Sequence, residues 1–277
     1  MKKTFLLALL LLNLKAMAGD IVADVSSSAY QGNGNYFEVG LVAGFIDNPL
    51  VRAADRADGA IIDVDAGGAY QYKSFFIEAS QGSQDGVNVG INIWNNRHWS
   101  VDILAASLFQ YLPPRDVPKH SKNEQERREK KLLSRDTIYS GSGIRITNYY
   151  NDYVFQYRLV TDTFSARGMI STLRFGRGWQ VRNWNIHTIL SAQYTSKKTN
   201  DYWFGVDRDE TTVNFPIYTP EASLHYSALL GLTYPLSENW VFRSFAGYVT
   251  VPKTVRDSPI VEGDHLKLLV STINYVF

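Results

Sequence analysis

Apolar and polar residues alternate along this chain in many separate stretches. The clearest is 222–234, where every second residue from Ala222 to Tyr234 is apolar and the residues between them, Leu229 apart, are polar or glycine. Such alternation predicts a strand with one apolar and one polar face. At 13 residues, this strand is longer than most soluble strands and suits a tilted crossing of a membrane.

The same alternation predicts twelve strands in all. Ten is the alternative number, because the third stretch is short and the ninth needs a bulge near Asn183 and Trp184. The expected fold class is therefore all-β, a transmembrane antiparallel up-and-down β-barrel. The predicted strands span roughly 36–45, 60–70, 75–80, 86–94, 99–111, 138–149, 153–163, 168–176, 179–195, 221–234, 240–250 and 264–277.

The connections between these strands alternate in length, which supports a barrel over a soluble β-sandwich. Outer-membrane barrels have short periplasmic turns and long outer loops. With a periplasmic N-terminus, the even-numbered connections should be short and the odd-numbered ones long. The short connections are 71–74, 95–98, 150–152, 177–178 and 235–239, and the long ones include 46–59, 112–137, 196–220 and 251–263.

The start of the chain predicts export. Basic residues at Lys2 and Lys3 precede a short apolar run, and Ala16-Met17-Ala18 follows as a small-x-small cleavage site. Residues 1–18 are thus expected to be a signal peptide. Residues 19–277 should form a single outer-membrane barrel domain, with strands from about residue 36 and a long charged outer loop at 112–137. The expected location is the outer membrane of a Gram-negative bacterium.

The last strand ends on alternate aromatic residues, Tyr275 and Phe277. Outer-membrane barrels finish in this way, and the barrel assembly machinery reads this C-terminal strand. Tyr275 and Phe277 are therefore predicted to form the barrel-closing signal.

Aromatic residues make up 13% of the chain, while the mean hydropathy is slightly negative at −0.20. Amphipathic rings are favoured at the membrane surface, where one part of the ring is in apolar surroundings and the other stays in water. Ten aromatic residues lie beside the predicted periplasmic ends of strands: Trp94, Trp99, Tyr149, Tyr150, Tyr153, Trp179, Tyr234, Trp240, Tyr275 and Phe277.

Charge and cysteine content exclude several classes of function. A formal net charge of +1 argues against nucleic acid as a partner. The absence of cysteine excludes disulfides and thiolate metal sites. The expected partners are instead outer-membrane lipid and lipopolysaccharide. The charged segment 119–131 favours a short solvated helix, with binding of lipopolysaccharide phosphates as a less favoured reading.

Seven charged residues fall on the polar face of predicted strands and should point into the lumen. Mutual neutralisation would give a filled or narrow lumen, whereas the alternative is a selective pore. We expect the three arginines to pair with the four carboxylates, because unpaired charges away from water are costly. The seven are Glu38, Asp63, Asp65, Asp102, Arg145, Arg158 and Arg174.

Catalysis finds little support in the sequence. The best serine and histidine neighbours are Ser223, His225 and Ser227, which share the polar face of one strand without an acidic or amide residue to orient the histidine. Nucleophilic catalysis needs such a third group. The chain is therefore not expected to be an enzyme, and no catalytic, cofactor-binding or metal-binding residue is predicted.

Two short motifs resemble those of the MipA/OmpV outer-membrane family. Asp201-Tyr202-Trp203-Phe204-Gly205-Val206 is similar to its Tyr-Tyr/Phe-Gly-Val motif, and Asp257-Ser258-Pro259-Ile260-Val261 to its Ser-Pro-Ile/Leu-Val step. The chain departs from the family pattern after Val206, where Asp207-Arg208-Asp209-Glu210-Thr211 follows.

This resemblance implies a non-enzymatic role. The best-known member of the family is a scaffold that brings a murein transglycosylase together with a penicillin-binding protein. A scaffold for peptidoglycan-remodelling enzymes, or a surface-exposed structural protein, is thus the expected function. A narrow channel for small polar solutes and an adhesin are the alternatives. Gly205 is expected to allow a tight loop turn, and Pro259 to rigidify the approach to the last strand.

Overall fold

The structure is a computed structural model that describes residues 34–49, 59–79, 86–109, 123–133, 138–163 and 167–277. The predicted signal peptide lies outside these residues. Twelve strands form the barrel: β1 Gly34–Asp47, β2 Gly59–Tyr72, β3 Phe75–Ala79, β4 Asn88–Asn95, β5 Trp99–Phe109, β6 Ile138–Tyr150, β7 Tyr153–Asp162, β8 Met169–Val181, β9 Trp184–Thr195, β10 Ser223–Pro235, β11 Trp240–Thr250 and β12 His265–Val276.

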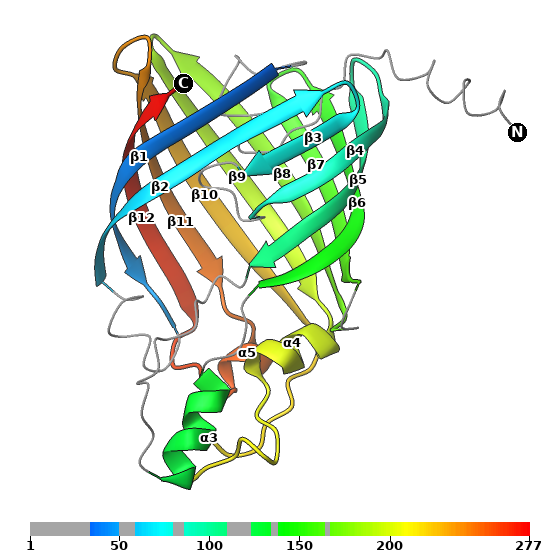
Figure 1. Cartoon of the computed structure of the whole chain (residues 1–277), viewed down its shortest axis with the longest axis vertical. Helices are drawn as coiled ribbons and strands as arrows, with labels where there is room; N and C mark the ends of the chain where they lie inside the picture. Colours follow the sequence, from blue (N-terminus) through cyan, green and yellow to red (C-terminus); the bar gives the residue numbers. More distant parts are fainter. Residues whose placement is uncertain (1–33, 50–58, 80–85, 110–122, 134–137, 164–166) are drawn as a thin grey trace, which may run out of the picture.

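Each strand pairs antiparallel with its neighbours in the chain, and β1 pairs with β12 to close the sheet (Figure 1). The predicted twelve-stranded antiparallel barrel is confirmed, and the ten-stranded alternative is wrong. Closure pairs β1 with β12 along both strands, so neither remains as an open edge in lipid.

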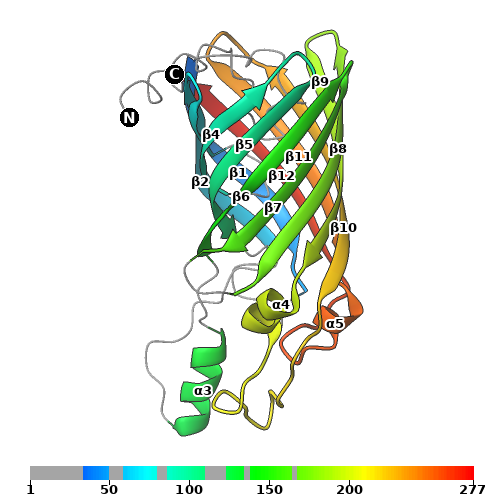
Figure 2. The same cartoon turned by 90° about the vertical axis from the view of Figure 1, so that its right-hand side faces the viewer.

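Among the described residues, three helices lie outside the barrel wall: α3 Glu124–Leu133, α4 Lys197–Phe204 and α5 Lys253–Arg256. All three lie at the end opposite the short turns and the C-terminus (Figures 1 and 2). The connections that carry these helices therefore lie at one end of the barrel, here called the outer mouth. Among the described residues, no helix has the length and apolar character needed to cross a membrane.

The turn between β8 and β9 lies at Arg182 and Asn183, so the predicted turn at 177–178 and the predicted bulge near Trp184 are wrong. Arg182 has φ 55°, and the first residues of two other two-residue turns, Lys73 and Asn151, have φ 55° and 52°. Tight hairpin turns require positive φ at this position, for which glycine is the usual sequence signal. The β8–β9 turn contains no glycine.

Alternation separates the two faces of the barrel wall as expected. Outward-facing apolar side chains are exposed, including Leu41, Ile62, Leu173, Leu190 and Ile273. The residues between them face the lumen and are mostly polar or small. This arrangement matches a wall between lipid and an enclosed interior.

Aromatic side chains gather at the end with the short turns. The rings of Trp240 and Tyr275 lie 5.3 Å apart, and those of Trp184 and Tyr234 lie 4.6 Å apart. Trp184 was missed by the sequence analysis because the predicted ninth strand began too early. Phe277 follows β12, donates its backbone N–H to the carbonyl of Phe37 at 2.9 Å, and packs its ring 5.7 Å from the Phe37 ring.

Candidate functional site in the lumen and at the outer mouth

A buried arginine, Arg145, organises one wall of the lumen. Arg145 on β6 lies opposite Asp102 on β5 in the strand register. Its Nε donates to Asp102 Oδ2 at 2.8 Å, and its Nη1 donates to Glu78 Oε1 on β3. The guanidinium also lies 5.0 Å from the centre of the Phe76 ring. Arg145 and Asp102 are both 0% exposed, so each charge depends on the others for compensation.

The two other predicted arginines bind amide side chains. Arg158 Nη2 donates to Asn88 Oδ1 at 2.8 Å, and Arg174 Nη1 donates to Gln156 Oε1 at 3.3 Å. Asn88 Nδ2 in turn donates to Glu78 Oε1 at 3.1 Å. Glu78 therefore connects Arg145 with Arg158 through one amide.

On the opposite wall, Glu38 on β1 forms an ion pair with Arg243 on β11. The strand between them, β12, contributes Asn274, whose Nδ2 donates to Thr272 Oγ1 at 2.8 Å. Asn274 lies opposite Gly40 in the β1–β12 register, and a Cβ at Gly40 would be 1.8 Å from Asn274 Oδ1. A glycine at position 40 is thus required for Asn274 to occupy this place.

Asp63 and Asp65 on β2 also face the lumen, but the structure does not bring them to the three predicted arginines. Within the described part of the chain neither aspartate forms an ion pair, and the Asp63 carboxylate accepts the Val64 N–H at 2.7 Å. Asp63 is exposed and Asp65 is half-buried. Asp63 and Asp65 therefore do not form the expected ion pairs with Arg145, Arg158 or Arg174. Those arginines contact Glu78, Asp102 or amide side chains instead.

The sequence analysis missed two charged members of the lumen network, Glu78 and Arg243. Glu78 lies on a strand of only five residues, β3, whose short alternation gave a weak signal. Phe75 and Ile77 face outward, so by alternation Phe76 and Glu78 face the lumen, and the position of Glu78 could have been predicted from this pattern. Arg243 follows the same parity on β11, where it lies between the lumen-facing residues Val241 and Phe245.

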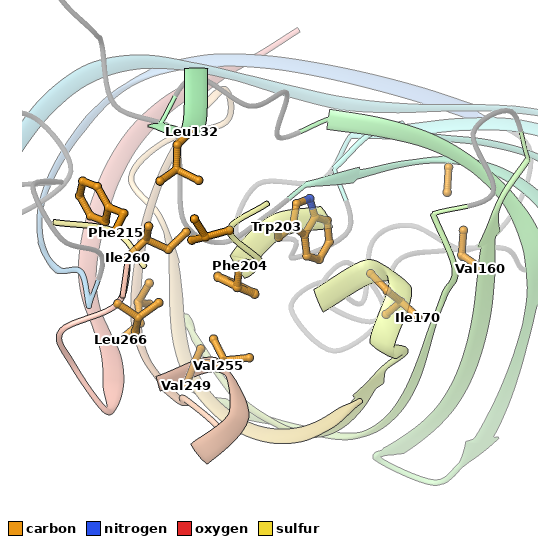
Figure 3. Close-up of a cluster of buried hydrophobic side chains, with 13 residues drawn as sticks. Leu132, Val160, Ile170, Trp203, Phe204, Phe215, Val249, Val255, Ile260 and Leu266 are labelled. Carbon is orange, nitrogen blue, oxygen red and sulfur yellow. The ribbon is translucent and has the colours of Figure 1, made fainter. Parts of the chain in front are cut away.

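The outer mouth contains a large cluster of buried apolar side chains, here called the mouth cluster. Its members come from α3, from α4 and the chain after it, from the chain around α5, and from the outer ends of five strands (Figure 3). It comprises Ala106, Leu132, Val160, Ile170, Trp203, Phe204, Val206, Phe215, Val249, Val255, Ile260, Val261 and Leu266.

The two family-like motifs contact each other inside the mouth cluster. Ser258 Oγ donates to the Phe204 carbonyl at 2.6 Å, and both residues are buried. Tyr202 packs against the cluster, and Pro259 follows Ser258 six residues before β12 begins. Two outer loops are thereby joined at the residues that carry the resemblance.

Gly205 does not serve a turn that needs unusual backbone angles. Its φ is −71° and its ψ is 160°, which is extended backbone, so the expectation of a tight turn there is wrong. A Cβ at this position would lie 2.5 Å from the Asp201 carbonyl oxygen, to which the Gly205 N–H donates at 2.9 Å. Glycine is therefore needed for close approach to the end of α4.

Helix α3 contacts the same assembly of loops. Glu129 Oε1 accepts hydrogen bonds from Asn214 Nδ2 at 3.0 Å and from Thr212 Oγ1 at 3.3 Å. Leu132 is buried in the mouth cluster. At the start of α3, hydrogen bonding from Arg127 lowers the pKa of the exposed Glu124 below its ordinary value. The helix expected within 119–131 is present over 124–133, and residues 119–122 lie outside the described residues.

The serine and histidine neighbours on β10 are not arranged as a catalytic pair. Ser223 Oγ accepts a hydrogen bond from Asn200 Nδ2 at 2.9 Å. In the described part of the chain, no hydrogen bond joins the His225 ring to Ser223 or Ser227. Across the same residues, no group of three or more histidine, aspartate and glutamate side chains could hold a metal ion.

Comparison with known families decides what this barrel is related to. Residues 27–277 match the family described as MltA-interacting protein MipA. The chain belongs to this family. The match includes both motifs of the mouth cluster and every strand of the barrel.

Two named relatives are similar to parts of the chain. The chain is 31% identical over 84 residues to "Outer membrane protein Omp26La" of Vibrio anguillarum, an alignment that covers 30% of this chain and 33% of that protein. It thus spans about a third of that relative's length. Identity to "MltA-interacting protein" of Escherichia coli K12 is 22% over 198 residues, covering 69% of this chain and 75% of the relative.

Matches to solved structures have low TM-scores. The NanC porin has a TM-score of 0.41 at 7% identity, covering 86% of this chain and 98% of the porin. The toluene transporter TodX of Pseudomonas putida has a TM-score of 0.36 at 11% identity, covering 95% and 97%. Family and fold together make this protein an outer-membrane β-barrel of the Gram-negative type.

Proposed function

We propose that this protein is a closed, non-enzymatic outer-membrane barrel that anchors peptidoglycan-remodelling enzymes at the inner surface of the outer membrane. The observation that carries this proposal is how the interior is filled. Arg145, Glu78 and Asp102 neutralise one another across one wall, and Glu38 and Arg243 do so across the other. The mouth cluster occupies the outer end. Side chains that bind one another in this way leave few charged groups free to bind a passing solute.

The class of partner follows from the family. One relative is named "MltA-interacting protein", so a lytic murein transglycosylase is the first partner to test. A bifunctional penicillin-binding protein, which the family resemblance implies, is the second. Neither partner requires chemistry from the barrel, because catalysis would reside in the bound enzymes.

A docking surface is available at the end with the short turns. Leu236, Trp240 and Phe277 are 52%, 45% and 73% exposed there. Trp and Phe anchors of this kind are enriched at protein interfaces. The same residues also suit the membrane surface, so the two roles must be separated by experiment.

Site-specific crosslinking tests the adaptor role. A photo-crosslinking amino acid at Leu236 should capture a transglycosylase in intact envelopes. The matched control is the same amino acid at Val213, which is 91% exposed at the outer mouth. Crosslinking from Val213 but not from Leu236 would contradict a periplasmic adaptor.

Conductance tests the closed barrel. Purified protein in planar bilayers should show little steady current, because Arg145 and Arg243 form ion pairs with carboxylates inside the lumen and the mouth cluster occupies the outer end. Stable, ion-selective channels would favour a second function, a narrow channel. One observation favours that alternative: Asp63 and Asp65 face the lumen from β2 without an ion pair among the described residues, and two such carboxylates would prefer cations.

Two further partners concern the membrane itself. The C-terminal strand, ending at Tyr275 and Phe277, would be read by the barrel assembly machinery. Lipopolysaccharide would contact the outer loops, where α3 carries Arg127 and Arg128 beside Glu124. Both contacts follow from membrane location and do not distinguish the adaptor from the channel.

A further inference from the structure

A cavity of about 70 Å³ lies at the outer end of the lumen, between α4 and the barrel wall. Residues from α4, the chain leading into α5 and the outer ends of β9 to β12 surround it. They are Thr195, Asn200, Trp203, Phe204, Ser223, His225, Val249, Thr250, Val251, Pro252, Val255 and Leu266.

The walls of the cavity are largely apolar. Trp203 and Phe204 come from α4, Val255 comes from α5, and Val249 and Leu266 come from the barrel, and all five are buried in the mouth cluster. Figure 3 shows Val249, Val255 and Leu266 grouped below Phe204. Apolar cavities of this kind favour apolar ligands over water.

Most polar groups on the wall are already bonded to the protein. Asn200 Nδ2 donates to Ser223 Oγ at 2.9 Å and to the Glu221 carbonyl at 2.7 Å. Thr250 Oγ1 accepts the Tyr226 N–H at 2.9 Å. These groups therefore have little capacity left for a ligand.

The His225 ring is not bonded in this way. Among the residues that the structure describes, it makes no hydrogen bond, although it lines the cavity. A neutral imidazole can donate from one nitrogen and accept at the other. The cavity thus combines apolar walls with an imidazole that a ligand could reach.

We propose that this cavity binds a small apolar molecule that carries one hydrogen-bonding group, such as a phenol. A single water needs about 10–15 Å³ of such space, so a cavity several times larger suits one substituted benzene ring. The ring would contact Trp203, Phe204 and Val255, and the hydroxyl would reach His225. This site is independent of the adaptor role proposed above.

Fluorine NMR of the full-length protein in detergent tests the proposal with two probes, 4-fluorophenol and fluorobenzene. Both should bind above the level set by empty micelles, and 4-fluorophenol should bind about 5–10-fold more tightly, since only it can hydrogen-bond. Failure of both probes to bind would overturn the proposal.

Variants then place the binding. Val255→Phe should fill the cavity and abolish binding of both probes, and His225→Phe should remove the preference for 4-fluorophenol while fluorobenzene still binds. The matched control, Ile260→Phe, enlarges a buried mouth-cluster residue that does not line the cavity and should leave both affinities unchanged. Folding of each variant is checked by its gel mobility before and after heating.

If Val255→Phe does not fold, Val249→Phe makes the same test from the barrel side. Binding that persists in a folded, filled variant would overturn the cavity as the site. A preference for 4-fluorophenol that survives in His225→Phe would overturn the role of the imidazole.

Discussion

In the middle of the lumen, Arg145 is surrounded by Glu78 and Asp102, whereas at the outer mouth Trp203 and Phe204 are surrounded by apolar side chains. Both regions fill the same barrel, but they tolerate change differently. A buried charge network fails when one member is removed, because the remaining charges lose their compensation. An apolar cluster loses contacts in proportion to the side chain removed and can partly relax.

The largest effect is expected for Arg145→Ala. It leaves Glu78 and Asp102 buried without their partner, which should destabilise the barrel by about 3–5 kcal/mol. Urea unfolding followed by gel mobility measures the change. The matched control is Arg177→Ala, since Arg177 lies over the rings of Tyr153 and Trp179 at the membrane surface and should cost about 1 kcal/mol or less. Equal costs for the two variants would contradict the contrast.

Trp203→Ala should come next, with a different kind of result. Loss of this buried ring costs about 3 kcal/mol locally. The cost should fall on the outer mouth, because Trp203 belongs to α4 and not to the closed sheet. Protease cleavage within 196–220 is expected to rise about 100-fold while the urea midpoint of the barrel stays unchanged. A large shift in that midpoint would show that mouth and barrel unfold together.

A smaller effect is expected for Ser258→Ala. It removes the hydrogen bond to the Phe204 carbonyl and leaves that buried oxygen without this donor, at a cost of about 1–2 kcal/mol. Hydrogen exchange of the Val206 amide, which is bonded to Tyr218, should quicken by about tenfold. Val213→Ala, at an exposed loop position, serves as the control and should change nothing.

The smallest effect concerns pH at α3. The pKa of Glu124 is lowered in the folded protein, so its contribution to helix stability is present above the ordinary value of 4.5 and is lost as pH falls through the lowered value. Helix α3 should therefore keep its exchange protection from pH 8 to pH 5 and weaken only at more acidic pH. Weakening already between pH 7 and pH 6 would argue against Glu124 as the responsible group.

Much of the barrel could be predicted because strand alternation and connection length depend on local sequence alone. The strands predicted at 221–234 and 264–277, which the structure has as β10 and β12, show this most clearly. The β8–β9 boundary could not be predicted, because Arg182 adopts a positive φ without a glycine to signal it. Local propensity was overridden there by the need for a two-residue turn.

The candidate site was likewise predicted only in part from the sequence. Parity correctly placed Arg145 and Asp102 on one face, but which carboxylate meets which arginine depends on how far neighbouring strands are offset. Glu78 reaches Arg145 from β3 across the interior, 67 residues away in the chain. The mouth cluster lies largely in loops, where alternation carries no information, so only the family-like motifs at Phe204 and Ser258 pointed to it.

The pairing of Gly40 with Asn274 has a consequence for how the barrel closes. These residues face each other on the β1–β12 seam, the last pairing that can form when the strands assemble in order. A slip of two residues would place Glu38 or Val42 opposite Asn274, and the Cβ of either residue would collide with the amide that Gly40 admits. The seam therefore favours the register in which Gly40 lies opposite Asn274 over a register shifted by two residues.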